Sequence, residues 1–212
     1  MPSATRTILV TGFEPFGGEA VNASWEAARK LDGWRGDGFA AVVRLLPCAY
    51  GASVKELVRA IEALRPEAIM MTGQAARRGV VCVERFAHNL DDAAAPDNLG
   101  VLRQAVAVAE GAPERLEAAA PASAIAGAIR AAGIPARVSR NAGGFVCNHL
   151  YFGALQYLRD KGNPTPAVFV HLPATPGQTP PAASARRLTA AEAAKALKAA
   201  AAAMLDVRAK AA

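Results

Sequence analysis

The sequence predicts an α/β fold in which a largely parallel sheet is covered by helices on both faces. Along its 212 residues, short apolar segments alternate with segments whose apolar residues repeat at helical spacing. The strand candidates are apolar throughout, which is typical of strands buried on both faces. The length favours one large domain over residues 1–212, with a hydrophobic core of its own.

The first half of the chain alternates between the two kinds of segment. Short apolar runs predict strands, and apolar side chains at helical spacing predict an amphipathic helix. In order, we expect a strand at 7–11, a loop at 12–18, a helix capped by Ser24 that ends near Leu31, a strand at 39–46, a helix at 52–65, a strand at 67–72 and a β-like segment at 79–90.

The second half continues this alternation. A loop is predicted at 91–103, where Pro, Gly, Asp and Asn gather. Thr189 and Glu192 have the spacing of a capping box and predict the start of the last helix. The remaining elements are a helix at 122–132 ended by Gly133, a strand that starts at Arg137, a helix at 147–159, a strand at 167–171 and a C-terminal helix at about 189–208.

Charge and composition argue against several classes of protein. The net charge is +6, but Lys and Arg are scattered and aromatic residues make up only 6%, which does not favour nucleic-acid binding. No apolar run is long enough to span a membrane. The N-terminus leads directly into an apolar strand without the layout of a signal peptide, so we expect a cytoplasmic protein. Three widely spaced cysteines indicate neither a disulfide framework nor a metal site.

Cys147 and His171 have the sequence contexts of a cysteine nucleophile and its base. Cys147 follows Gly143 and Gly144 at a predicted helix start, where free N–H groups and the helix dipole are expected to lower the pKa of the thiol. His171 ends the apolar run 167–170, and functional groups in α/β folds gather where strands end. The alternative interpretation of Cys147 is a small core residue at a helix start.

The other cysteines and histidines fit these roles less well. Cys48 and Cys82 are interpreted as buried structural residues, since free Cys is often buried. His149 lies two residues after Cys147 on the same predicted helix, and residues at that spacing do not face each other. His88 lies within a strand candidate and is interpreted as a satisfied polar residue.

A third group would be needed to orient the imidazole of His171. Glu84 stands out because it lies within the apolar run 80–86, although a solvated strand face would also explain it. The candidates for the third group are Glu84, Asp91, Asp92 and Asp97.

The loop 12–18 contains Phe13 and Phe16 between glycines. It matches neither of the glycine-rich patterns that cradle phosphates. Its aromatic residues favour an apolar pocket, and the alternative is that they plug the core.

Four groups of motifs occur in a recognisable order. They are GFEPFGG at 12–18 with NASW at 22–25, TGQA at 72–75 with ERFAHN at 84–89, PDNLG at 96–100, and AGGFVCN at 142–148 with HLP at 171–173, Pro176 and Gln178. Together they resemble pyroglutamyl peptidase I, also called pyrrolidone-carboxylate peptidase, a family of cysteine peptidases.

The resemblance implies a role for each matching residue. Cys147 would be the nucleophile, His171 the general base and acid, and Glu84 the group that orients the imidazole. It further implies a three-layer α/β/α sandwich of the phosphorylase/hydrolase kind with a mixed, mostly parallel sheet, a homotetramer or dimer, no cofactor and no metal, and peptides with N-terminal pyroglutamate as substrates. The residues that would bind the pyroglutamyl ring are Phe13, Phe16, Gln74, Phe145 and Val146.

The sequence departs from the family pattern around the expected pocket. Ala94 replaces an arginine and Ala95 replaces a bulky residue of the family motif, while Ala23 replaces a proline. We therefore hypothesise that pyroglutamyl turnover is reduced or that a different acyl group is accepted. An amidase or peptidase with altered acyl specificity and a non-catalytic binding protein are the competing functions.

Overall fold

The computed structural model describes residues 6–36, 38–178 and 186–211. The expectation about a signal peptide concerns the N-terminal end, of which residues 1–5 lie outside the described ranges. The strands are β1 (Arg6–Phe13), β2 (Arg35–Gly36), β3 (Phe39–Leu46), β4 (Ala68–Gln74), β5 (Val81–Glu84), β6 (Phe86–His88), β7 (Arg115–Glu117), β8 (Ala136–Ser139) and β9 (Ala167–Leu172). The helices are α1 (Ala23–Ala28), the 3-10 turn η1 (Arg29–Leu31), α2 (Ala52–Leu64), α3 (Ala122–Ala131), α4 (Val146–Asp160) and α5 (Ala190–Ala211).

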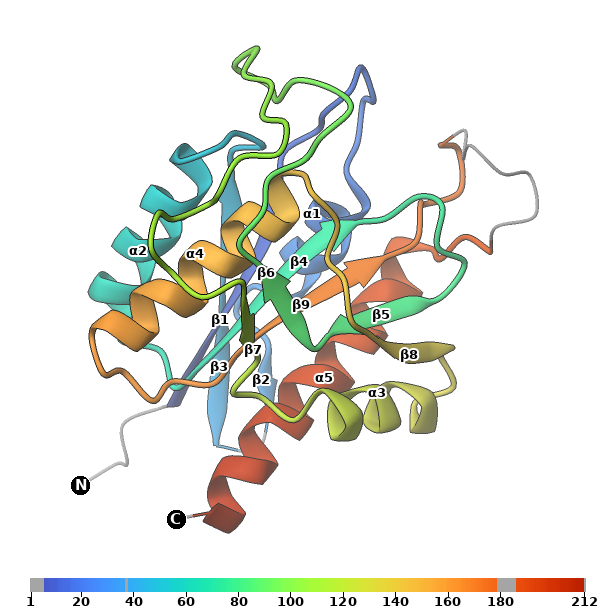
Figure 1. The fold of residues 1–212 in the computed structure, drawn as a ribbon. Helices are drawn as coiled ribbons and strands as arrows, with labels where there is room; N and C mark the ends of the chain where they lie inside the picture. Colours follow the sequence, from blue (N-terminus) through green and yellow to red (C-terminus); the bar gives the residue numbers. More distant parts are fainter. Residues whose placement is uncertain (1–5, 37, 179–185, 212) are drawn as a thin grey trace.

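A mixed, mostly parallel sheet forms the centre of the molecule. Within the described residues it has seven strands in the order β2-β3-β1-β4-β9-β5-β8. The neighbours β3, β1, β4 and β9 are parallel, and so are β5 and β8, while β5 is antiparallel to β9 and β2 to β3. Helices lie on both sides of this sheet (Figure 1). The predicted α/β class and the α/β/α sandwich are confirmed.

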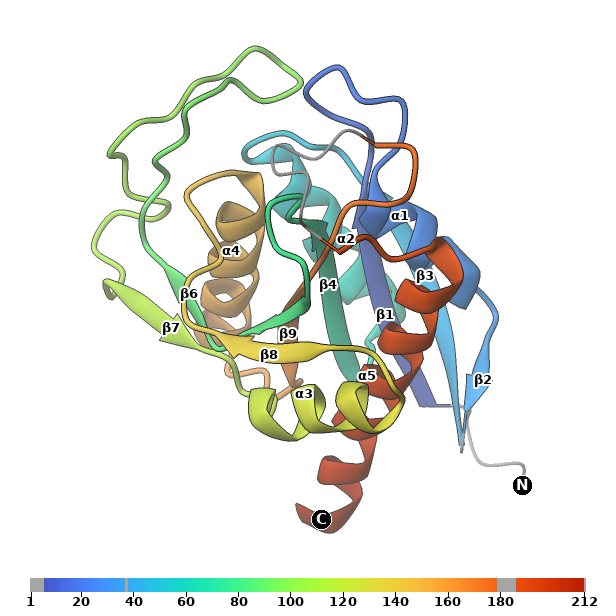
Figure 2. The same ribbon diagram turned by 90° about the vertical axis from the view of Figure 1, so that its right-hand side faces the viewer.

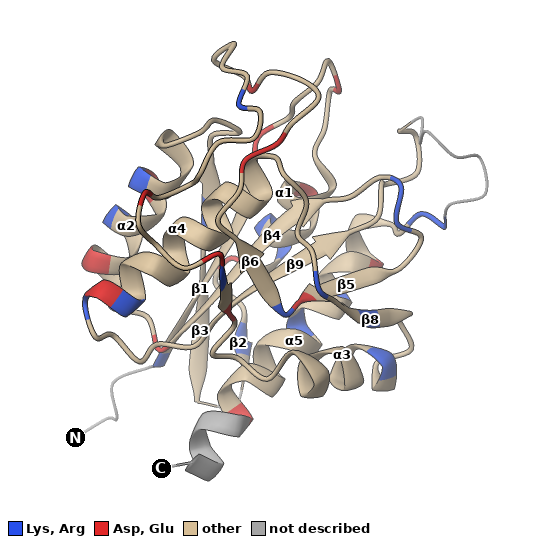
Figure 3. Ribbon diagram, viewed as in Figure 1, with Lys and Arg blue, Asp and Glu red and all other residues tan. Residues whose placement is uncertain are grey.

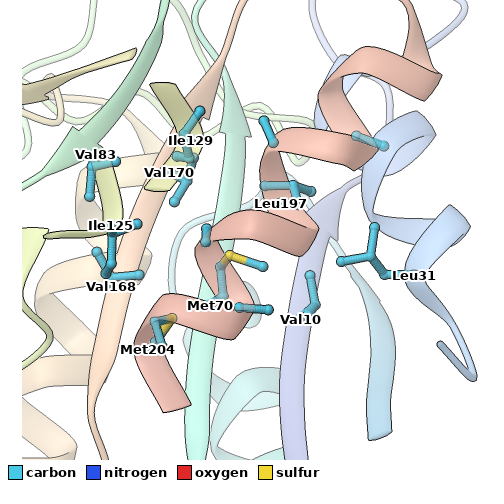
Figure 4. Packing of buried hydrophobic residues seen from close by; sticks show 14 of the residues in the cluster. Val10, Leu31, Met70, Val83, Ile125, Ile129, Val168, Val170, Leu197 and Met204 are labelled. Atoms are coloured by element: carbon cyan, nitrogen blue, oxygen red, sulfur yellow. The ribbon is translucent and has the colours of Figure 1, made fainter. Parts of the chain in front are cut away.

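Alternate residues of the central strands point to opposite faces, as the pleat of a strand requires. On one face Val10 and Met70 pack in a buried cluster with Leu197 of α5, together with residues of α1 and α3 (Figure 4). On the other face Ile69 packs with Leu150 of α4 and with residues of α2. The continuously apolar strands therefore supply both cores at once.

The N-cap of helix α1 lies two residues before Ser24, the predicted cap. Asn22 is the N-cap, and its side-chain oxygen accepts a hydrogen bond from the backbone N–H of Ser24 at 3.0 Å. Ser24 lies inside the helix, fully buried, where its hydroxyl accepts from the backbone N–H of Phe13 at 3.0 Å. The prediction of Ser24 as cap was wrong because Asn and Ser cap equally well and only packing selects between them.

The β-like segment 79–90 forms two strands in two different sheets. β5 belongs to the central sheet, whereas β6 pairs antiparallel with β7 in a two-stranded sheet. The exposed Arg85 lies between them and donates its backbone N–H to the carbonyl of Ser139 at 2.8 Å. This change of partner depends on contacts far apart in sequence, which a local pattern does not encode.

Two long loops lie at one end of the central sheet. The loop 13–22 and the segment 89–112 extend beyond the same end of the sheet (Figure 2).

Positive and negative side chains alternate on α2, where Arg59 and Glu56 form an ion pair (Figure 3). Within the described ranges, none of the helices combines the length and the apolar character that crossing a membrane requires.

Candidate active site

Gly73 lies next to both Cys147 and His171. In the parallel pair β4 and β9, Gly73 lies opposite His171. A Cβ atom added to Gly73 would lie 2.8 Å from Sγ of Cys147 and 2.8 Å from the ring of Phe169. Only glycine fits here, because any side chain would displace the thiol. The sheet thus brings the thiol of α4 to the strand that carries the imidazole.

The turn before α4 depends on two glycines. Gly143 has a φ of +90°, a conformation that favours glycine, and its N–H donates to the side chain of Asn141 at 2.8 Å. A Cβ atom on Gly144 would lie 2.4 Å from the carbonyl oxygen of Asp92, whose own N–H donates to the carbonyl of Gly144 at 2.9 Å. This close approach ties the turn before α4 to the segment 91–106.

Glu84 contacts the imidazole of His171. Nδ1 of His171 lies 2.8 Å from Oε1 of Glu84, and the side chains are 4% and 0% exposed. The Glu84 carboxylate can only accept, so Nδ1 carries the proton. The other nitrogen, Nε2, is then left without a proton and can act as a base. A solvated strand face, the alternative considered for Glu84, is excluded by its full burial.

Arg78 supplies the cation that the buried carboxylate requires. One of its terminal nitrogens donates to Oε1 of Glu84 at 2.5 Å, and the other donates to the carbonyl of Asn141 at 2.7 Å. Arg78 therefore joins Glu84 to the turn that precedes Cys147. A buried charge without such a partner is strongly unfavourable.

Burial has the largest effect on the pKa of both Cys147 and His171. Burial raises the pKa of Cys147, and the charges of Cys48 and Glu84 add to this. Arg78 and the backbone N–H of Cys147 itself lower this pKa, but the net shift is opposite to the lowering expected from the helix N-terminus. Burial also lowers the pKa of His171, against the opposing effect of Glu84. Although burial opposes it, the hydrogen bond and charge of His171 and the charge of Arg78 lower the pKa of Glu84.

An apolar cavity opens beside Cys147. Its volume is about 290 Å³, and it has much more apolar than polar lining. The rings of Phe16 and Phe145 are 5.8 Å apart, and Tyr50 packs edge-on against Phe145 at 5.9 Å. The lining residues are Phe13, Phe16, Asn22, Cys48, Gln74, Ala75, Arg78, Ala142, Gly143, Phe145, Cys147 and His171.

Four of the five residues expected at the pyroglutamyl ring line this cavity. The exception is Val146, which is fully buried in the core between the sheet and α4 and is absent from the lining. Phe13 serves both interpretations of its loop, because it belongs to the same core cluster and also forms part of the cavity wall.

The remaining candidates have other partners. Oδ2 of Asp91 contacts Nδ1 of His149 at 2.8 Å, and Nε2 of His149 accepts from the backbone N–H of Gly51 at 3.0 Å. Nε2 of His88 lies 2.9 Å from the carbonyl of Arg140. Asp97 binds the backbone N–H of Tyr50, and Asp92 that of Ala105. Of the four carboxylates, Glu84 alone contacts His171 in the described part of the chain.

The sequence did not indicate Arg78 as a part of the site, and it gave Gln178 a place in the family motif but no role. A cation near Glu84 could have been inferred, since a carboxylate in an apolar strand needs a partner. Gln178 follows β9 and contacts Gln74, which no local signal predicts. Cys48, interpreted as structural, is 3% exposed but lines the cavity. Burial, with the charges of Glu14 and Asp97, raises its pKa to about 12.

Two of the positions that depart from the family motif, Ala94 and Ala95, lie outside the cavity lining. Ala94 and Ala95 are both exposed in the segment that follows Asp92.

Comparisons with known proteins agree with the motifs. A family model described as pyroglutamyl peptidase matches residues 6–207. A pyrrolidone-carboxylate peptidase of Chromobacterium violaceum is 49% identical over 176 residues, which cover 82% of this chain and 80% of the relative.

Solved structures support the same assignment. Pyroglutamyl peptidase I of Bacillus amyloliquefaciens superposes with a TM-score of 0.90 at 37% identity, covering 94% of this chain and 96% of that one. Pyrrolidone carboxyl peptidase of Thermococcus litoralis gives a TM-score of 0.92 at 32% identity, covering 98% and 96%. Fold, motifs and near full-length similarity together show that the chain belongs to the pyroglutamyl peptidase family of cysteine exopeptidases.

Proposed function

We propose that this chain removes N-terminal pyroglutamate from peptides with Cys147 as nucleophile, His171 as base and acid, and Glu84 as the orienting group. The observation that carries the proposal is the buried 2.8 Å contact between Glu84 and His171, beside a cavity that Cys147 also lines. The three side chains supply the nucleophile, base and orienting group that acyl transfer by a thiol requires.

The reaction starts from the neutral thiol and imidazole. Nε2 of His171 takes the proton of Cys147 as the sulfur attacks the carbonyl carbon, and the C–S bond forms. The backbone N–H of Cys147 lies in the first turn of α4 and has no backbone acceptor among the described residues, so it is available to the developing oxyanion. His171 then donates its proton to the leaving amine as the C–N bond breaks.

The second half of the reaction releases the acyl group. A water molecule gives a proton to Nε2 of His171 and attacks the thioester. The C–S bond breaks, pyroglutamate leaves, and the proton returns to the sulfur of Cys147. Glu84 stays ionised throughout and stabilises the imidazolium that forms in each step.

The cavity suits a small neutral ring. Aromatic walls from Phe13, Phe16 and Phe145 pack against ring faces, while Gln74 supplies a polar contact. A free N-terminal ammonium would lose its hydration in this apolar space without gaining a partner there, which disfavours ordinary N-termini.

Hydrolysis of a pyroglutamyl arylamide tests the assignment. We expect turnover by the wild type and none above background by Cys147→Ala. Cys147→Ser keeps the size of the side chain and serves as the packing control, and we expect it to be inactive with an unchanged unfolding midpoint. Wild-type binding of the arylamide without turnover would favour a non-catalytic binding protein, and Cys147→Ala as active as wild type would refute the nucleophile.

An altered acyl preference is the second candidate, and the departures from the family motif at Ala94 and Ala95 motivate it. Their loss of bulk and charge relative to the family motif would weaken contacts at the rim of the site. We expect Ala94→Arg with Ala95→Ile to raise kcat/KM for the pyroglutamyl arylamide. Wild-type turnover at ordinary family efficiency, with no gain in the double variant, would refute reduced or altered specificity.

We also propose a homo-oligomer, a dimer or tetramer, in the cytoplasm. The resemblance implies the assembly, and a row of exposed apolar side chains supports it. These are Leu90, Leu99, Val101, Leu102 and Val106, all within the segment 89–112. Exposed apolar side chains gathered on one segment are typical of a protein interface.

A further inference from the structure

Gln178 connects three segments around the cavity although it does not line it. It is 5% exposed and lies six residues beyond the end of β9. Its Oε1 accepts from the backbone N–H and hydroxyl of Thr175 at 2.9 and 3.1 Å. Its Nε2 donates to the carbonyl of Val21 at 3.2 Å, to Oε1 of Gln74 at 3.2 Å and, more distantly, to Glu19 at 3.5 Å.

These contacts leave one orientation for the Gln178 amide. The backbone N–H of Thr175 can only donate, so the atom beside it must be the oxygen of Gln178. The carbonyl of Val21 can only accept, so the atom beside it must be the nitrogen. Exchanging the two atoms would set two donors against each other at Thr175 and two acceptors against each other at Val21.

Gln178 and the backbone N–H of Ala23 together fix the orientation of the Gln74 amide, which does line the cavity. Oε1 of Gln74 accepts from the backbone N–H of Ala23 at 2.7 Å and from Nε2 of Gln178. Both acceptor positions of this oxygen are therefore used. Nε2 of Gln74 has no hydrogen-bond partner among the described residues, so its two N–H groups are the polar atoms that remain for a ligand.

We propose that Gln178 is a positioning residue that holds the Gln74 amide with its N–H groups available to the ring carbonyl of the bound acyl group. The inference rests on the proposed function, because it takes the ring to be a lactam. With the amide reversed, Oε1 of Gln74 would face the lactam oxygen and repel it. The held orientation therefore selects rings with an acceptor over rings of the same shape without one.

Two ligands of similar shape separate this role from general packing. Pyroglutamic acid amide carries the ring carbonyl, and cyclopentanecarboxamide does not. We expect Gln178→Leu to raise KM for the pyroglutamyl arylamide and the inhibition constant of the lactam ligand by roughly tenfold, as for loss of a hydrogen bond. The inhibition constant of the carbocyclic ligand should stay within twofold, and kcat should change less than KM.

Further variants make the test robust. Gln178→Glu keeps the acceptor for Thr175 and the size of the side chain but cannot donate to Gln74, and we expect the same selective loss. Gln156→Leu is the matched control. Gln156 lies on α4, its side chain bonds only to Asp160 among the described residues, and the variant should leave all constants unchanged. In a Gln74→Glu background, Gln178→Leu should add little, because the two residues act through one contact.

The outcomes distinguish the two proposals. If wild type hydrolyses the arylamide but Gln178→Leu and Gln178→Glu weaken both ligands equally, the positioning role is refuted and the proposed function stands. If wild type shows no hydrolysis, the proposed function fails. Direct calorimetric binding of the two ligands then still tests the orientation of the amide, and equal affinities in wild type would refute it.

Discussion

Single residues show how this site maintains a charge in its interior. Glu84 is fully buried, yet its ionised form is favoured because His171 and Arg78 both donate to the same oxygen. His171 stays neutral because burial lowers its pKa more than Glu84 raises it. The result is a base that holds its proton on Nδ1 and has Nε2 free.

Replacing Glu84 tests the orienting role. Glu84→Gln keeps the shape but removes the charge that holds the imidazole tautomer and stabilises the imidazolium. We expect kcat for a pyroglutamyl arylamide to fall roughly 1,000- to 10,000-fold, the scale seen when an orienting carboxylate is made neutral. Glu117→Gln, at an exposed ion pair with Arg85, is the control and should retain activity. A kcat within tenfold of wild type for Glu84→Gln would contradict the assignment.

The rate should depend on pH through His171. The imidazole acts as a base only when neutral, so kcat/KM falls as the pH drops through its pKa, which burial lowers below the ordinary value of about 6.5. Arg78 also lowers this pKa, so we expect Arg78→Met to move the acid limb of the pH–rate profile to higher pH and to reduce the maximal rate.

Arg77 provides a matched control for this measurement. It is the exposed neighbour of Arg78 in sequence, so Arg77→Met removes the same charge from the chain without touching Glu84. Its acid limb should coincide with that of the wild type. Equal shifts in both variants would show that overall charge, rather than the contact with Glu84, controls the profile.

At the scale of elements, the site depends on places where backbones approach closely. The sheet register sets Gly73 against His171, and the turn before α4 packs Gly144 on the backbone of Asp92. The capping of α1 by Asn22 lets Ser24 hold the end of β1. Each contact joins segments that a local sequence window does not contain.

Gly144→Ala tests the close approach at the nucleophile turn. Its Cβ would meet the carbonyl oxygen of Asp92 at 2.4 Å, so the turn must shift. We expect kcat/KM to fall at least tenfold and the free energy of unfolding to fall by about 1–3 kcal/mol, as for overpacking. Equilibrium urea unfolding and the arylamide assay measure the two effects.

Gly127 is the control for this substitution. It lies within α3, where an added Cβ meets nothing closer than 3.9 Å. Gly127→Ala should therefore leave activity unchanged and stabilise the protein by about 0.5–1 kcal/mol through helix propensity. If both alanine variants behaved alike, the contact with Asp92 would not constrain the turn.

At the scale of the whole molecule, two cores on either side of one sheet support loops at one end of it (Figure 1). The segment 89–112 is one of these loops and carries exposed apolar side chains. The nucleophile turn packs on the same segment through Gly144 and Asp92. An interface there would lie next to the active site.

Charged substitutions test the proposed assembly. Leu99 and Leu102 are 70% and 48% exposed, so replacing both with Asp costs the folded chain little but disfavours burial in an interface. We expect light scattering to show a multiple of the chain mass for wild type and a lower mass for the double variant. Leu45→Asp, 47% exposed and outside the segment, should leave the mass unchanged. A wild-type monomer would refute the proposal.

Much of the fold could be predicted because its signals are local. Continuous apolar runs mark the strands, and apolar spacing marks α2, whose predicted bounds of 52–65 differ little from Ala52–Leu64. The division of 79–90 between two sheets was not predicted, because pairing with β7 and β8 involves partners far along the chain. The same limit applies to Arg78 and Gln178, whose roles arise from contacts across elements.

The sequence alone determined the alternation of strands and helices, the family motifs and, through them, Cys147 and His171 as the candidate nucleophile and base. Only the tertiary structure decided which of four carboxylates meets His171, since Asp91, Asp92 and Asp97 bind elsewhere. It also decided that burial raises the pKa of Cys147, against the lowering expected at a helix N-terminus. The physical reason is that pairing and burial depend on the packing of distant segments, whereas periodicity and motifs are written in neighbouring residues.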